Sequence, residues 1–67
     1  MTAAEFELLD ESAAHALLGW RFRALTDAGY ELAEALTLTT ATEVDLHLAC
    51  DLIRRGCPPE TALRILL

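Results

Sequence analysis

The sequence predicts an all-α fold, a compact bundle of about four short helices built from two helix–glycine turn–helix corners. Apolar residues recur at helical spacing along residues 12–67. Two glycines end apolar segments in the same way, Gly29 four residues after Leu25 and Gly56 four residues after Leu52. Such a glycine supplies the left-handed residue of a Schellman cap. Each glycine therefore predicts the end of one helix and a turn into the next.

The two corners share one sequence pattern at a constant offset. Residues 25–38 and 52–65 both read Leu, three residues, Gly, an apolar residue, four residues, Ala, Leu, one residue and an aliphatic residue. Tyr30 follows the glycine in the first corner and Cys57 follows it in the second. We expect each to pack against the leucine that begins its corner. The match supports two helix–turn–helix units.

Cap and turn residues place the four helices. The expected ranges are residues 13–28, 31–39, 43–55 and 58–67. Asp10 or Ser12 caps the first helix, and Thr42 with Asp45 forms a capping box ahead of the third. The proline pair at 58–59 opens the last helix, because proline suits the first helical position.

The first and third helices carry most of the expected core. The stripe of the first helix consists of Ala14, Leu17, Leu18, Phe22 and Leu25. Trp20 lies on a second apolar strip, where it is either a core residue or an interface anchor. The third helix has a wide apolar arc that includes Leu48, so we expect it to be mostly buried between the first two helices and the last. The exposed edge of the third helix is expected to be Glu43, His47, Asp51 and Arg54.

Residues 1–11 are expected to form an acidic, partly ordered arm ahead of a single helical domain at residues 12–67. Thr2 and Glu5 are spaced for a capping box. Residues 5–8 also alternate apolar and acidic side chains as a strand does. Both interpretations of the arm remain open at this point.

The chain has more apolar residues than a domain of its size can bury. It has 67 residues, of which 54% are apolar, and so short a chain buries only about 60% of its unfolded surface. The surplus favours an oligomer interface or a permanent protein partner. The expected anchors of that interface are Trp20, Phe22, Tyr30, Leu63, Leu66 and Leu67.

The charge is acidic and unevenly distributed. The net charge is −6, and residues 1–45 carry nine acidic residues against two arginines. This balance steers the protein toward basic surfaces and away from phosphate backbones. No apolar run approaches the ~20 residues that span a bilayer. With an acidic start and two cysteines, the chain is expected in the cytoplasm and away from membranes.

The two cysteines and the histidines are the candidate ligands of a metal site. His47, Cys50 and Cys57 could supply three ligands, with Asp51 or His15 as a fourth. The spacing matches no closed zinc pattern, and packing at the second corner already explains Cys57. We therefore predict no metal and no cofactor.

Catalysis is not expected either. Ser12 and His15 stand three residues apart near a helix start, where serine acts more simply as a cap. A nucleophile pair of His47 and Cys50 lacks an oxyanion donor, and the chain is small for enclosing a substrate. The protein is expected not to be an enzyme.

Residues 56–66 offer one resemblance to a DNA-binding family. They read Gly-Cys-Pro-Pro-Glu-Thr-Ala-Leu-Arg-Ile-Leu, which resembles the turn and second helix of helix-turn-helix repressors. The resemblance implies that five side chains would face the DNA groove, those of Pro58, Pro59, Glu60, Leu63 and Arg64. Base edges and phosphates are read by Arg, Lys, Asn, Gln or Ser, and only one of the five is of this kind.

The sequence thus favours a non-enzymatic interaction module, either a homo-oligomer such as a dimer or a protein docked on a partner. The alternative is a helix-turn-helix regulator formed by residues 44–67. Its DNA contacts would be Arg54, Arg55 and Arg64. Nucleic acid is disfavoured by the acidic balance of the chain.

Overall fold

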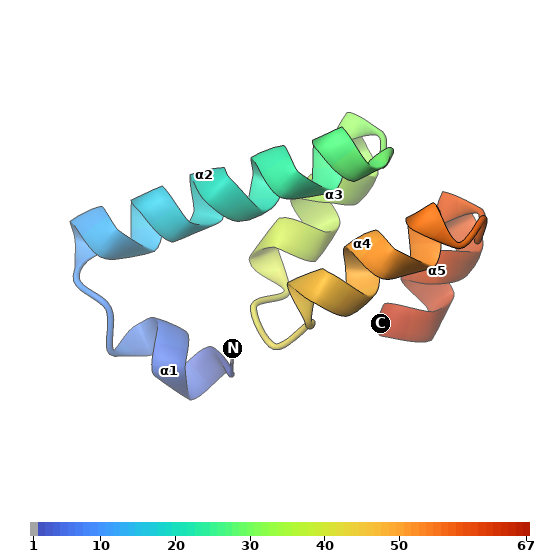
Figure 1. Ribbon diagram of the computed structural model, residues 1–67. Helices are drawn as coiled ribbons and strands as arrows, with labels where there is room; N and C mark the ends of the chain where they lie inside the picture. Colours follow the sequence, from blue (N-terminus) through green and yellow to red (C-terminus); the bar gives the residue numbers. More distant parts are fainter. Residues whose placement is uncertain (1) are drawn as a thin grey trace.

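The computed structural model describes residues 2–67, and this part of the chain is all-α (Figure 1). Its helices are α1 (Ala3–Glu7), α2 (Glu11–Ala28), α3 (Leu32–Thr40), α4 (Leu46–Arg54) and α5 (Pro59–Leu66). The predicted all-α bundle is confirmed. The four expected helices correspond to α2–α5, and the segment ahead of them forms a further short helix, α1.

The longest helix, α2, is the element against which the bundle is assembled (Figure 1). α3 and α4 both pack against α2, and α5 packs against α3 and α4. The buried residues of α2, Arg21 and Leu25, lie in its C-terminal half. The core therefore lies toward that end, and the first half of α2 extends away from it above α1. This arrangement gives an elongated molecule of 35 × 19 × 17 Å.

The core is small and rich in alanine. Its buried apolar residues are Leu25, Tyr30, Ala35, Leu38, Val44, Ala49, Cys50 and Ala62. Leu25 and Leu38 are its largest fully buried side chains. Alanines at the centres of α3, α4 and α5 leave little side-chain volume between helices, which lets the helices approach closely. Such a core contains few large side chains, so many large apolar side chains of the protein lie outside it.

The first predicted corner is confirmed. Gly29 has a φ of 127° at the end of α2. Its N–H donates to the carbonyl of Thr26 at 3.2 Å, and the N–H of Tyr30 donates to the carbonyl of Leu25, also at 3.2 Å. These two bonds are the pair that defines a Schellman cap.

The second corner repeats this geometry. Gly56 has a φ of 93°, and the N–H of Cys57 donates to the carbonyl of Leu52 at 2.9 Å. The proline pair then opens α5 as predicted, with Pro58 as the N-cap and Pro59 as the first helical residue.

The predicted start of the third helix is wrong. α4 begins at Leu46, and its cap is Asp45, whose carboxylate accepts the N–H groups of His47 and Leu48 at 2.8 and 3.3 Å. Thr42 is not a cap and is buried in the connection between α3 and α4. The expected capping box does not form, because the Asp45 carboxylate is used at the start of α4 and Thr42 lies ahead of that helix.

The starts of α1 and α2 decide which of the predicted cap residues are used. Asp10 rather than Ser12 caps α2, accepting the N–H of Ala13 at 2.7 Å. Thr2 accepts the N–H of Glu5 at 3.1 Å, which begins α1. Helix rather than strand is thus the structure of residues 5–7.

The glycines allow a matched test of the corner geometry. Gly19→Ala should raise the free energy of unfolding by about 1 kcal/mol, since glycine is that much poorer than alanine inside a helix and the added Cβ meets nothing within 4 Å. Gly29→Ala should lower it by about 1–3 kcal/mol, because φ is 127° and the Cβ would lie 3.2 Å from Ile53 Cγ2. Urea denaturation of both variants measures the two shifts. A Gly29→Ala protein as stable as the parent would contradict the cap.

Candidate functional site

The outer face of α3 is an unpartnered apolar surface. Its exposed residues are Leu32, Ala33, Leu36, Thr37 and Thr40, and we call this set the α3 face. Leu32 is 66% exposed and Leu36 is 56% exposed. Four residues apart on a helix, they are neighbours on its surface. Two large leucines thus stand side by side in water.

The threonines of the α3 face do not make it polar. The hydroxyl of Thr37 donates to the carbonyl of Ala33 at 3.0 Å. That of Thr40 is 3.2 Å from the carbonyls of Leu36 and Thr37. Both hydroxyl protons are therefore used within the helix, a habit of threonine in helices. A molecule packed against the α3 face would therefore meet mainly methyl and methylene groups and few free hydrogen-bond donors.

Acidic residues lie at both ends of the α3 face. Glu31 and Glu34 form a capping box at the start of α3, with the Glu34 carboxylate accepting the N–H of Glu31 at 2.9 Å. Glu43 and Asp45 are exposed in the segment that follows α3. The sequence from residue 24 to 53 contains no arginine and no lysine. The α3 face thus lies in a part of the chain whose fixed charges are all negative.

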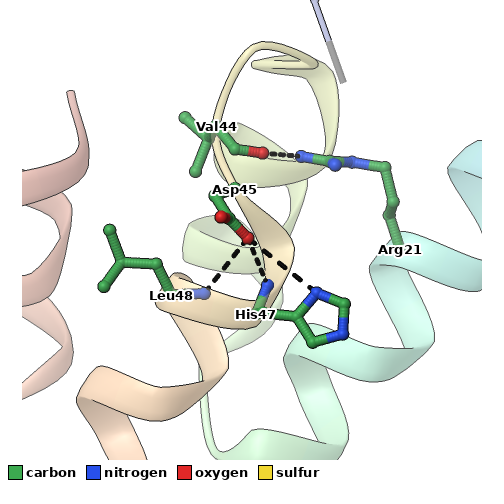
Figure 2. A network of polar contacts seen from close by, with 5 residues as sticks. All are labelled: Arg21, Val44, Asp45, His47 and Leu48. Atoms are coloured by element: carbon green, nitrogen blue, oxygen red, sulfur yellow. Dashed lines mark hydrogen bonds and ion pairs between the residues drawn. The ribbon is translucent and has the colours of Figure 1, made fainter.

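Arg21 binds the C-terminal end of α3 and the segment that follows it, and Figure 2 shows its contact with Val44. The side chain is 3% exposed, and its Nη2 lies 3.2 Å from the carbonyl oxygen of Leu38 and 3.3 Å from those of Ala41 and Val44. Carbonyls in the last turn of a helix lack partners within that helix. One guanidinium from α2 thus binds the end of α3 and the connection to α4.

Burial sets the electrostatics of Arg21. Desolvation lowers the pKa of its guanidinium, and the charges of Glu43 and Asp45 raise it in part. Nε is buried without a hydrogen-bond partner among residues 2–67. Arginine stays protonated in proteins even so. The site is therefore a buried cation that is satisfied mainly by carbonyl dipoles.

Sequence reasoning missed this role, although one signal was present. Arg21 stands four residues after Leu17 and four before Leu25, on the stripe that faces the core. A cation in line with core leucines indicates a buried partner, and here that partner is backbone.

The predicted interaction anchors fall into three groups. Trp20 (58% exposed) and Leu67 lie on the surface. Three others, Phe22, Leu63 and Leu66, are partly buried and pack against the core. Tyr30 is 4% exposed and its hydroxyl donates to the carbonyl of Ala49 at 2.8 Å. Burial raises the Tyr30 pKa. Tyr30 is thus engaged inside the chain, and the core interpretation of Trp20 is wrong.

Further exposed leucines and isoleucine were not among the predicted anchors. Leu8, Leu32, Leu36, Leu48 and Ile65 all stand largely in solvent. Leu48 had been assigned to the buried arc of the third helix. It is about half exposed because α4 packs mainly against α2 and α5, which cover less than the expected arc.

The three arginines proposed as DNA contacts are exposed. Arg54 and Arg55 end α4, and Arg64 lies in the last turn of α5. Arg55 also forms an ion pair with Asp51, with Nη2 and Oδ2 3.1 Å apart. An ion pair within one helix reduces the charge that this arginine presents to a phosphate.

The histidine and cysteine candidates do not converge. Residues 2–67 contain no group of three or more His, Cys, Asp or Glu side chains placed to hold a metal, and no pocket. The Nδ1 atom of His47 lies 3.9 Å from Oδ1 of Asp45 (Figure 2). Cys50 and Cys57 are free thiols that contact the carbonyls of Ala24 and Pro58. Each sulfur is thus accounted for by local packing.

Comparison with known proteins found no match to a family model, to a curated protein or to a solved structure. No helix within residues 2–67 has the length and apolar character needed to cross a membrane.

Arg21 can be tested against its neighbour Arg23. Arg21→Met should lower the free energy of unfolding by about 2–3 kcal/mol, since the buried carbonyls lose their charged donor. Arg23→Met should change it by less than about 0.5 kcal/mol, because Arg23 is exposed. Thermal and urea unfolding followed by circular dichroism measure both. Equal effects of the two variants would contradict the role of Arg21.

The two thiols should differ in reactivity. Cys50 is buried, and burial is the largest of the effects that raise the pKa of its thiol. Cys57 is only partly covered. With a disulfide reagent at pH 8, Cys50 should react at least about tenfold more slowly than Cys57. Single cysteine-to-serine variants separate the two rates, and full unfolding in urea should make them equal. Rapid reaction of Cys50 in the folded protein would contradict the packing around it.

Proposed function

We propose that the protein is a non-enzymatic interaction module of the cytoplasm that docks on another protein chain through the α3 face. The observation that carries the proposal is the pair of exposed leucines, Leu32 and Leu36, on a helix face whose threonine hydroxyls are bonded within the helix. Burying a leucine side chain contributes about 1.5–3 kcal/mol. Two adjacent leucines therefore supply the centre of a docking site.

The rest of the surface supports the same function. Trp20, Ile65 and Leu67 are more than half exposed, which extends the apolar surface beyond α3. Tryptophan is enriched among residues that dominate binding energies. A 67-residue chain that leaves these side chains in water gains more from an interface than a domain with a complete core does.

A helix-turn-helix regulator is the second candidate. Its support is the exposure of Arg54 and Arg55 at the end of α4 and of Arg64 in the last turn of α5. Against it stand the net charge of −6, the ion pair of Arg55 with Asp51 and the proline pair at the start of α5. The two candidates differ in salt dependence, because phosphate contacts weaken steeply with salt.

The α3 face is tested by one double variant. Leu32→Ser combined with Leu36→Ser should abolish association, whether with a second copy or with a partner, and should leave the fold intact because both side chains are exposed. Sedimentation equilibrium over a wide concentration range measures self-association. A photo-crosslinking residue at position 36 should give one discrete protein adduct in the cells that make the protein.

The matched control is Leu8→Ser, which removes another exposed leucine outside the bundle. A crosslinker at the exposed position 11 controls for random adducts. The proposal fails if the parent protein is a monomer and position 36 yields no adduct beyond that of position 11. Salt-sensitive binding of mixed duplex DNA that is lost in Arg64→Ala would favour the second candidate.

A further inference from the structure

We infer that the partner of the α3 face is an amphipathic α-helix of another protein, with arginine or lysine at both ends of its apolar stripe. The inference rests on the proposed function and names the chemistry of the partner. It follows from what the α3 face offers and from what lies at its ends.

The α3 face favours a helix over a strand or a loop. Thr37 and Thr40 use their hydroxyl protons within α3, and the remaining exposed residues are Leu32, Ala33 and Leu36. A strand or loop pressed against it would bury backbone N–H and C=O groups with few partners, which is costly. A helix satisfies its own backbone and presents side chains at i, i+3 and i+4.

The dimensions of α3 set the length of the contact. Its nine residues span about 13 Å at the helical rise of 1.5 Å per residue. Leu32 and Leu36 are one turn apart and leave grooves into which two or three apolar side chains of a partner helix fit. The contact therefore covers about two and a half turns of the partner, at a pitch of about 5.4 Å per turn.

The acidic residues at both ends of α3 favour basic residues at both ends of the partner's apolar stripe. Glu31 and Glu34 lie at its start, and Glu43 and Asp45 lie just beyond its end. Arg21, which reaches the end of α3, is buried and bound to carbonyls. Complementary potentials favour association and suppress other partners. A basic residue beyond each end of the apolar stripe meets this pattern.

A second copy of the chain fits this surface poorly. Antiparallel pairing of two α3 faces would place Glu31 and Glu34 of one copy beside Glu43 and Asp45 of the other, and parallel pairing would place each acidic pair beside itself. Each copy carries a net charge of −6, so both arrangements bring like charges together. Anionic membranes and nucleic acids are repelled for the same reason.

The test is a synthetic helical peptide titrated with the full chain and followed by fluorescence anisotropy. The probe has about 18 residues, enough for substantial helicity, with one leucine stripe and lysines at both ends. Its matched control has the same leucines and glutamates in place of the lysines. We expect the basic peptide to bind at least about tenfold more tightly than the acidic one, and this preference should shrink as added salt shortens the Debye length.

Variants of the protein locate the binding. Leu36→Ser should weaken binding of the basic peptide by about tenfold, the effect of losing roughly 1.4 kcal/mol of apolar contact. Glu43→Gln should weaken it by a smaller factor that disappears at high salt, and Leu8→Ser should leave it unchanged. Equal binding of the two peptides, no binding of the basic peptide, or full binding to Leu36→Ser would each overturn the inference.

The proposed function and this inference can fail separately. Self-association that requires Leu36, together with no binding of the basic peptide, overturns the helical partner and leaves the α3 face as an interface. A parent protein that neither self-associates nor gives crosslinked adducts at position 36 beyond those at position 11 overturns the proposed function itself. Binding of the basic peptide that depends on Leu36 supports both.

Discussion

The arrangement of the bundle depends on the guanidinium of Arg21. Its three carbonyl partners come from the end of α3, the loop after it and the residue before the cap of α4. Hydrogen bonds to a charged donor are stronger than neutral ones, and buried acceptors without a partner are costly. A single side chain of α2 thus fixes where α3 ends and how the chain enters α4.

This constraint explains why α3 can carry so apolar an outer face. Threonine is a poor helix former, and α3 ends with Thr37, Leu38, Thr39 and Thr40. A short helix of this composition would not be stable alone. Inside the protein, Ala35 and Leu38 pack into the core and Arg21 binds the carbonyl of Leu38. The core and the buried cation hold the helix, so its outer residues need not contribute to folding.

The sequence was sufficient for α2, α3, α5 and both corners, because these depend on local chemistry, whereas α4 begins at Leu46 rather than near residue 43 and α1 was not predicted as a helix. A glycine followed by an apolar residue and a proline pair act mainly through the backbone angle φ, and Gly29, Gly56 and Pro59 lie where the pattern places them. The surface could not be derived in this way. Helical periodicity indicates which residues share a face, but whether that face is covered depends on where the neighbouring helices pack. For this reason the prediction that Leu48 is buried is wrong, the choice between core and interface for Trp20 stayed open, and the burial of Arg21 was not predicted.

The small size of the core residues connects the core to the proposed function. Small residues such as Ala35, Ala49 and Ala62 let the helices pack closely but contribute little apolar area of their own. The protein thus folds on a small core and retains Leu32 and Leu36 in water. A partner that binds only the folded chain stabilises it by mass action. Because α3 depends on the core and on Arg21 for its structure, a partner bound to the α3 face would also stabilise the contacts beneath it.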